Sequence, residues 1–314
     1  MQFCLPVIEY ALPSCRHSLA DLERRGQLDS PADTLASFGF AHALVSDGPA
    51  EALASAALAR LLRGHSVDPE SIDALFYAGA LPASHACSAH DEPGWLDGFN
   101  YPAARLQYEL GLINAAVCGI GQVGCLGLMS AIATAIDWLS ARPEATRAVA
   151  LSADVLPAGA SREILYNVIS DGACAVLVER GAGPNRVAAR RQITKGYYWN
   201  AQTHRNELVA AYFPTARTIV LELLRSAGLV LDDITRVIPH NVSRRSWEIL
   251  LGLLGLPLDR LYADNIAAKG HVIAADNLIN LKDAADSGAI RRGDRVLLFN
   301  FGFGANWAAW VIEH

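Results

Sequence analysis

Hydrophobic positions follow two patterns that recur along the chain. Short runs of Val, Ile, Leu and Ala with little alternation predict strands buried on both faces. Between them lie longer stretches with apolar residues at helical spacing. The predicted strands are 72–78, 148–152, 173–179, 186–194, 234–239, 295–301 and 308–312, and the predicted helices are 49–63, 101–110, 125–141, 211–227, 243–254 and 272–287. Apolar strands separated by helices predict an α/β protein whose sheets are covered on both faces.

A weak internal repeat divides these elements into two similar sets. Residues 57–79 resemble residues 221–241, since in both a helix ends, an acidic turn follows and an isoleucine begins a strand. Residues 124–154 resemble residues 270–302, and each segment opens on a glycine that precedes a helix. Two copies of this length indicate duplication rather than a solenoid. We therefore predict an N-terminal half, 1–180, and a C-terminal half, 181–314, in which Cys125 and His271 occupy equivalent positions.

Composition narrows the class of protein. Hydrophobic residues make up 52% of the 314 residues and charged residues 18%, which predicts a folded chain with a large core. A net charge of −6 argues against a nucleic-acid partner. The sequence shows neither a signal peptide nor an apolar run long enough for a membrane helix. The six cysteines form no CxxC pair, so we expect free thiols in the reducing cytoplasm.

The most informative chemical feature is Cys125, in the sequence Gly-Cys-Leu-Gly-Leu at the start of a predicted apolar helix. Unpaired N–H groups and the positive end of the helix dipole favour the nucleophilic thiolate. The main rival is Cys118, which also has a neighbouring glycine but no long helix after it. We interpret Cys4, Cys118 and Cys174 as inert core residues.

Two histidines also stand at element boundaries. His240 follows a predicted strand in Val-Ile-Pro-His-Asn, and His271 follows Gly270 before a predicted helix. One cysteine and two such histidines suggest acyl transfer through a thioester. His240 could instead be a solvated strand-end residue, and His271 a helix cap. The remaining histidines are interpreted as surface or structural, and the cluster His85, Cys87 and His90 as a loop rather than a metal site, because no second ligand pair accompanies it.

The chain resembles the β-ketoacyl-ACP synthase III group of the thiolase fold. The resemblance covers nearly the whole chain and rests on the order and spacing of several segments. These are Tyr10-Ala11-Leu12-Pro13, 72–78, Tyr101-Pro102, Cys125-Leu126-Gly127-Leu128, Ala153-Asp154-Val155-Leu156, Asp171-Gly172-Ala173, Pro239-His240-Asn241 and Phe301-Gly302-Phe303-Gly304-Ala305. It implies a five-layered αβαβα architecture built from two duplicated halves.

The resemblance also implies roles for individual residues. Cys125 would accept the acyl group, and His240 would hydrogen-bond the donor carbonyl or act as a base. His271 stands at the third catalytic position, where the family typically has Asn. Backbone N–H groups of Cys125 and of the loop containing Gly302 and Gly304 would form an oxyanion hole; the two glycines could also simply make a tight turn.

Two more residues gain expected roles in the same way. Tyr101 falls where the family places a residue that reaches into the acyl pocket of the partner subunit. Arg245 falls on a position used for contact with the carrier protein, although an arginine there also suits a solvated helix. Residues 35–47 lack the Trp and Arg with which typical members clamp the adenine of coenzyme A, and this departure suggests a relative from a specialised-metabolite pathway.

These features predict a ketosynthase III-like acyltransferase. An acyl-CoA or acyl-ACP would acylate Cys125, and the acyl group would pass to a carbon nucleophile from a malonyl- or β-ketoacyl-thioester. Two alternatives remain: acyl transfer to a hydroxyl or amine, and an inactive partner subunit of a ketosynthase heterodimer. We expect no metal and no bound cofactor, since coenzyme A or phosphopantetheine belongs to the substrate. We expect a homodimer, or a heterodimer with a related ketosynthase, without nucleic-acid or membrane partners.

Overall fold

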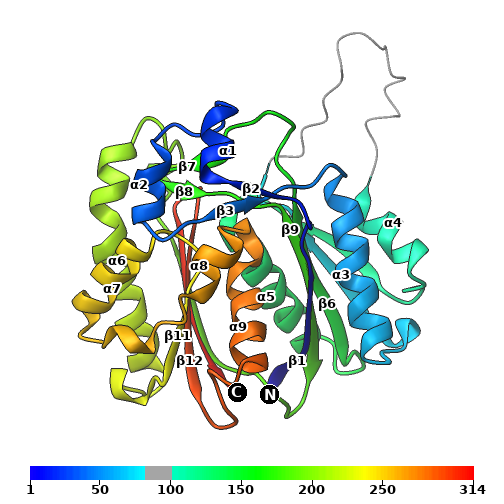
Figure 1. The fold of residues 1–314 in the computed structure, drawn as a ribbon. Helices are drawn as coiled ribbons and strands as arrows, with labels where there is room; N and C mark the ends of the chain where they lie inside the picture. Colours follow the sequence, from blue (N-terminus) through cyan, green and yellow to red (C-terminus); the bar gives the residue numbers. More distant parts are fainter. Residues whose placement is uncertain (82–100) are drawn as a thin grey trace.

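The computed structural model describes residues 1–81 and 101–314, and its two sets of strands enclose a pair of central helices (Figure 1). None of the helices in the described ranges is both long and apolar enough to cross a bilayer. Both chain termini lie at the same end of the molecule (Figure 1).

Five of the described strands in the large sheet belong to the N-terminal half. β4 (Ala74–Ala78) pairs in parallel with β5 (Ala116–Ile120) on one side and β6 (Arg147–Asp154) on the other. β9 (Gly172–Arg180) runs antiparallel to both β6 and β1 (Phe3–Ala11). β5 is the edge strand of this set, and four of its five residues are exposed.

Four described strands of the C-terminal half repeat this order. β11 (Arg236–Ile238) is parallel to β12 (Arg295–Gly302), which pairs antiparallel with β13 (Asn306–Glu313), and β13 pairs antiparallel with β10 (Arg186–Thr194). A single registered pair between β1 and β10 joins the two sets. The strand order is therefore β11-β12-β13-β10-β1-β9-β6-β4-β5.

Helices form the other three layers. α5 (Gly127–Ser140) and α9 (Asp276–Asp286) lie between the two sets of strands, α3 (Ala50–Gly64) and α4 (Pro102–Glu109) cover the N-terminal set, and α6 (Arg205–Ser226) and α7 (Arg244–Leu254) cover the C-terminal set (Figure 1). This is the five-layered thiolase fold that the sequence predicted. The central helices are buried on several faces, since each packs between strands and against its neighbour.

The internal repeat is visible in the structure. α3 leads into β4 as α6 leads into β11, and α5 leads into β6 as α9 leads into β12. The predicted boundary at residue 180 falls at the end of β9, before β10 begins the second set, and it stays a prediction.

Several elements differ from the sequence-based expectation. α5 begins at Gly127, so Cys125 lies in a short turn before the helix rather than on it. α9 begins at Asp276 rather than at 272, and His271 precedes the short turn Ile273–Ala275 that leads into it. Cys118 was expected in the core, but it lies exposed on β5, because that strand is at the edge of the sheet.

Smaller elements cap the end of the molecule opposite the termini (Figure 1). These elements were missed because two to six residues are too few for a hydrophobic period to show. They are β2 (Arg16–Ser18), β3 (His42–Leu44), α1 (Leu19–Arg24), α2 (Ala32–Ser37), α8 (Asp264–Lys269) and the hairpin of β7 (Glu163–Ile164) and β8 (Asn167–Val168).

Candidate active site

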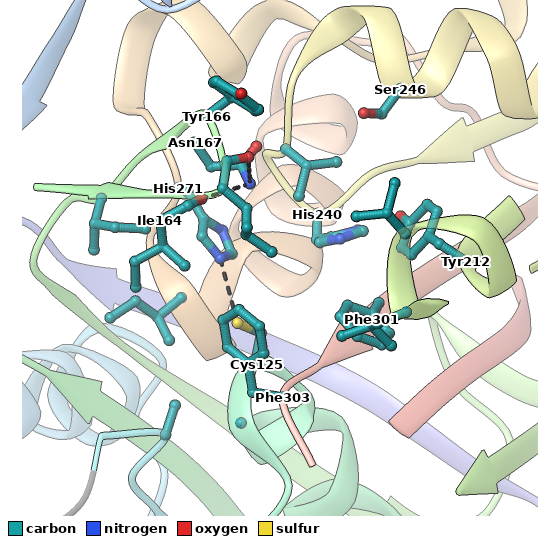
Figure 2. Close-up of a pocket in the computed structure, with 18 of the residues that line it drawn as sticks. Cys125, Ile164, Tyr166, Asn167, Tyr212, His240, Ser246, His271, Phe301 and Phe303 are labelled. Carbon is teal, nitrogen blue, oxygen red and sulfur yellow. Dashed lines mark hydrogen bonds between the residues drawn. The ribbon is translucent and has the colours of Figure 1, made fainter. Parts of the chain in front are cut away.

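Cys125 lies in a tight turn pressed against the loop between β12 and β13. The turn spans Gly124–Leu126, and Gly124 has a φ of +53°. A Cβ at Gly302 would lie 2.1 Å from the Val123 carbonyl oxygen and 2.9 Å from the Cys125 nitrogen. Only glycine permits this approach of the two backbones. The sulfur is thereby presented at the end of α5, facing the cavity (Figure 2).

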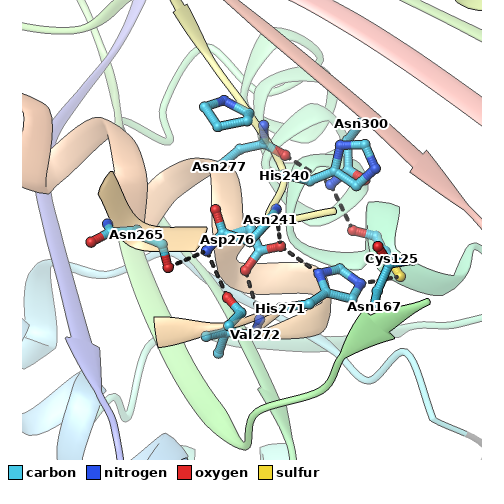
Figure 3. Close-up of polar contacts among 12 residues, drawn as sticks. Cys125, Asn167, His240, Asn241, Asn265, His271, Val272, Asp276, Asn277 and Asn300 are labelled. Carbon is cyan, nitrogen blue, oxygen red and sulfur yellow. Dashed lines mark hydrogen bonds and ion pairs between the residues drawn. The ribbon is translucent and has the colours of Figure 1, made fainter. Parts of the chain in front are cut away.

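The Cys125 sulfur, His271 and Asp276 are connected by a chain of two hydrogen bonds. Cys125 Sγ lies 3.3 Å from His271 Nε2, and His271 Nδ1 lies 2.5 Å from Asp276 Oδ2 (Figure 3). His271 is 5% exposed and Asp276 is fully buried. The three side chains form a nucleophile, a base and a group that orients the base.

Asp276 was missed by the sequence analysis, although it stands five residues after His271 at the start of the helix that the repeat predicts. Its two oxygens accept the backbone N–H groups of Val272 at 2.7 Å and Asn241 at 2.6 Å. As the first residue of α9 it also lies at the positive end of the helix dipole. These contacts stabilise the carboxylate and fix its direction toward His271.

The charge of His271 follows from these neighbours. Burial alone would lower its pKa, but the negative charges of Asp276 and Cys125 and their hydrogen bonds outweigh burial and raise the pKa to about 10. Once Cys125 carries an acyl group, the charge of its sulfur disappears and one of these raising causes with it. His271 can therefore hold a proton beside a thiolate and give it up more readily beside a thioester.

His240 lies in the same cavity with a different charge state. Its ring is 1% exposed, and its centroid lies 6.2 Å from that of His271. Burial and the positive charge of His271 lower the pKa of His240 to about 3, an effect that the backbone of Phe299 only partly offsets. His240 is therefore neutral near pH 7, with one ring nitrogen as a donor and the other as an acceptor.

Buried amides hold the catalytic segments together. Asn300 Nδ2 donates to the Cys125 carbonyl at 2.9 Å and to Asn277 Oδ1 at 2.8 Å, while Asn277 Nδ2 donates to the carbonyl oxygens of Ile238 and Phe299. α9 is thus tied to the ends of β11 and β12 and to the nucleophile turn (Figure 3). This network fixes the distance between Cys125 and His271 from both sides.

The catalytic groups open into a cavity of about 650 Å³. Its wall is mainly apolar and comes from the β7–β8 hairpin, the start of α6, the start of α7 and the β12–β13 loop (Figure 2). The lining residues are Ala80, Leu81, Gly124, Cys125, Ile164, Leu165, Tyr166, Asn167, Ile169, Arg205, Asn206, Leu208, Val209, Tyr212, Phe213, His240, Val242, Ser246, His271, Ile273, Phe301 and Phe303.

The structure brings Cys125, His240 and His271 together at this cavity and places Gly302 against the nucleophile turn. Gly304 has a φ of +84° and lies in the same loop, and the oxyanion hole stays a prediction. Tyr101 is 63% exposed at the start of α4 and does not line the cavity of its own chain. Arg245 lies exposed on α7 with Glu248 3.0 Å away, one residue before Ser246 at the cavity wall.

Within the described ranges, no three His, Cys, Asp or Glu side chains gather in a way that could hold a metal ion. His85, Cys87 and His90 lie outside the described residues, so their interpretation as a loop stays a prediction.

Comparisons with known proteins point to one family. Residues 224–314 match the family model described as 3-oxoacyl-[acyl-carrier-protein] synthase III, C terminal. The β-ketoacyl-[acyl-carrier-protein] synthase III of Caldanaerobacter subterraneus is 26% identical over 298 residues, which cover 83% of this chain and 82% of that relative.

Solved structures agree on the fold. The 3-oxoacyl-[acyl-carrier-protein] synthase III of Aquifex aeolicus matches with a TM-score of 0.84 at 20% identity, over 99% of this chain and all of that chain. ChlB3, described as an acyltransferase, matches with a TM-score of 0.85 at 23% identity, over all of this chain and 98% of that chain.

Proposed function

Since the chain is a β-ketoacyl-ACP synthase III-like acyltransferase, we propose that it moves an acyl group from a thioester, through Cys125, to a hydroxyl or amine acceptor. The observation that carries this proposal is the line of hydrogen bonds from Asp276 through His271 to Cys125. It favours the acceptor class that the sequence left as an alternative to carbon.

The first half-reaction acylates Cys125. His271 Nε2 holds the proton that Cys125 has given up, as its raised pKa favours, and the thiolate attacks the carbonyl carbon of the donor thioester. The donor sulfur then leaves and takes the proton from His271. Coenzyme A or a phosphopantetheine arm enters as part of the donor, and this chain supplies the nucleophile, the base and the carboxylate that orients the base.

The second half-reaction needs different catalytic groups for a hydroxyl or amine acceptor than for a carbon acceptor. A neutral His271 that donates its Nδ1–H to Asp276 leaves Nε2 with a free lone pair beside the acyl group. That nitrogen can remove a proton from a hydroxyl or amine as it attacks the thioester. Decarboxylation of a malonyl-thioester needs hydrogen-bond donors at the developing enolate oxygen instead. A base oriented by a buried carboxylate suits the first reaction better.

Carbon condensation remains the second candidate. His240 lies in the same cavity as His271, so two imidazoles could donate to one enolate oxygen if His271 is protonated. The relative from Caldanaerobacter subterraneus named above is a β-ketoacyl-ACP synthase III, which also favours this candidate. The specialised-metabolite role and a cytoplasmic setting are part of the proposal in either case.

The substitution His271→Asn distinguishes the two candidates. An amide can donate a hydrogen bond to an enolate oxygen but cannot take a proton from an alcohol. We expect acyl transfer to alcohols or amines to fall about 100-fold, a typical loss for removal of a general base. Stopped reactions resolved by liquid chromatography and mass spectrometry, with malonyl-thioester, alcohol and amine acceptors offered in parallel, measure both products.

The matched control is His65→Asn, which changes a surface histidine paired with Glu9 and should leave all rates unchanged. Full retention of turnover in His271→Asn, with a β-ketoacyl product, would assign the chain to carbon condensation. Unchanged turnover in both His271→Asn and His271→Ala would remove His271 from the mechanism.

We also propose a two-fold dimer in which Tyr101 reaches the acyl pocket of the partner subunit and Arg245 contacts a carrier protein. Exposure of Tyr101 away from the cavity of its own chain supports the first part, and exposure of Arg245 beside the cavity wall supports the second. Light scattering is expected to give twice the 33.6 kDa chain mass. A stable monomer that turns over substrate would contradict the dimer.

A further inference from the structure

Tyr212 presents a hydroxyl group to the cavity from α6. Its ring is fixed edge-on against Phe301, with centroids 5.3 Å apart, and against Phe299, with centroids 6.3 Å apart. The hydroxyl makes no hydrogen bond to any residue within 1–81 or 101–314. Burial and the nearby charge of Cys125 raise the pKa of Tyr212, so this hydroxyl stays protonated and can donate.

His240 presents a second unsatisfied polar group to the same part of the cavity. It is almost fully buried, and neither ring nitrogen makes a hydrogen bond of standard geometry in the described ranges. Its centroid lies 6.0 Å from that of Phe299, so the His240 and Tyr212 rings both pack against one phenylalanine.

These two groups contrast with the polar network below them. The amide N–H groups of Asn277, Asn280 and Asn300 are all paired with protein oxygens, and within the described ranges Asn300 Oδ1 is the one carbonyl oxygen of these three amides without a partner. A buried polar group without a partner, as at His240, is costly, and native structures retain few of them away from functional sites; the Tyr212 side chain is only partly buried and lines the same cavity. An apolar wall that contains a small number of such groups is typical of a binding site in which a ligand supplies the missing partners.

We propose that Tyr212 and His240 form a polar subsite for the acceptor, which binds a second oxygen or nitrogen atom next to the one that is acylated. The proposal rests on the proposed function, since it assumes a hydroxyl or amine acceptor. The ring centroids of His240 and His271 are 6.2 Å apart, a span that two heteroatoms on neighbouring or next-neighbouring carbons can bridge. The acceptor class is therefore a diol or amino alcohol on a mainly apolar framework that fits the surrounding aliphatic and aromatic wall.

The reaction at this site balances within the groups already described. The acceptor hydroxyl nearest His271 gives its proton to Nε2 and forms an ester bond to the acyl carbon. The bond from that carbon to Cys125 Sγ breaks, and the resulting thiolate remains paired with the protonated His271. The second hydroxyl keeps its proton and serves only to hold the acceptor through Tyr212 and His240.

The test compares two alcohols that share one ring. Cys125 is first acylated with whichever acyl-N-acetylcysteamine thioester, from acetyl to octanoyl, reacts fastest. The isolated acyl-enzyme is then mixed with cyclohexanol or with trans-1,2-cyclohexanediol, and loss of the acyl group is followed by intact-protein mass spectrometry. We expect wild-type enzyme to react about tenfold faster with the diol, which is the worth of one additional hydrogen bond.

The substitution Tyr212→Phe removes the hydroxyl and keeps the ring. We expect the preference for the diol to fall to about twofold or less, with unchanged reaction of cyclohexanol and unchanged acylation of Cys125. Tyr197→Phe, at an exposed tyrosine stacked on His204 and outside the cavity lining, should behave as wild type. A Tyr212→Phe enzyme that keeps the tenfold preference, or a wild type that uses both alcohols equally, would overturn the subsite and leave the proposed function intact.

A binding measurement separates failure of the subsite from failure of the proposed function. Unacylated enzyme is treated with iodoacetamide while trans-1,2-cyclohexanediol or cyclohexanol is added, and protection of Cys125 gives the apparent affinity of each. In the wild type we expect the diol to protect Cys125 more strongly than cyclohexanol does. In Tyr212→Phe we expect the two alcohols to protect Cys125 equally. Absence of transfer to any alcohol together with diol-specific protection would count against the proposed function alone. Equal protection by both alcohols would overturn the subsite.

Discussion

Replacement of Cys125 by alanine is expected to abolish acyl transfer and to leave no covalently acylated enzyme. The sulfur is the nucleophile that forms the thioester, and alanine leaves no atom that can carry the acyl group. Serine at the same position should also be poor, because a hydroxyl is a much weaker nucleophile than a thiol at neutral pH. We expect a loss of about 10⁴-fold or more in turnover for the alanine variant.

Intact-protein mass spectrometry after incubation with acyl thioesters measures the acyl-enzyme directly, and peptide mapping locates it. Cys118→Ala is the matched control, since Cys118 also stands beside a glycine but is an exposed thiol on the edge strand β5, whereas Cys125 is half-buried. It should be acylated and turn over as wild type does. Acylation that persists in Cys125→Ala and disappears in Cys118→Ala would reverse the assignment.

Replacement of Asp276 by asparagine is expected to reduce transfer by about 10²- to 10⁴-fold while leaving Cys125 in place. The carboxylate accepts from His271 Nδ1, and an amide at that position can present an N–H instead and so favour the wrong tautomer. It would also set an amide N–H against the backbone N–H of Val272 or Asn241. We therefore expect a lower melting temperature as well, and rates must be measured well below it.

The pH dependence gives a second readout of the same change. Burial lowers the pKa of His271, and the Asp276 charge is the largest cause that raises it. Loss of that charge lowers the pKa, so the neutral, basic form of His271 appears at lower pH. In single-turnover transfer from the acyl-enzyme, the rising limb of the pH profile should therefore move to lower pH, with a lower plateau.

Asp283→Asn provides the control for this experiment. Asp283 is also on α9 and forms an ion pair with Lys269, but it does not contact His271. Its variant should keep the wild-type pH profile even if stability falls. An Asp276→Asn enzyme with an unshifted profile would show that His271 does not act as the base.

Much of the architecture could be predicted from the sequence because it depends on local patterns. Apolar strands without alternation indicated sheets covered on both faces, and the repeat of residues 57–79 at 221–241 indicated two similar halves. Both predictions are confirmed, since the two sets of strands follow the same order around α5 and α9. The glycines that precede Cys125 and His271 were noted in the sequence only as part of the repeat, and both have a positive φ in the structure.

The chemistry of the site could be predicted only in part. Cys125, His240 and His271 were expected at one centre, and the structure brings them to one cavity. The opposite charge states of the two histidines could not be predicted, because they depend on which groups surround each ring. Asp276 lies beside His271 and makes it a base, whereas His240 is buried without a counter-charge and stays neutral.

Local sequence patterns could not predict the roles of Asp276 and Tyr212 or the exposure of the edge strand β5. In the sequence Asp276 looks like an ordinary acidic residue at a helix start, and Tyr212 like one more aromatic residue on a helix. Folding buries Asp276 among hydrogen-bond donors. It places Tyr212, without a hydrogen-bond partner in the described ranges, at a cavity assembled from segments more than 100 residues apart. The residue types and local turns were fixed by the chain itself, but burial, charge and hydrogen-bond partners are properties of the assembled neighbourhood, and only the tertiary structure decides them.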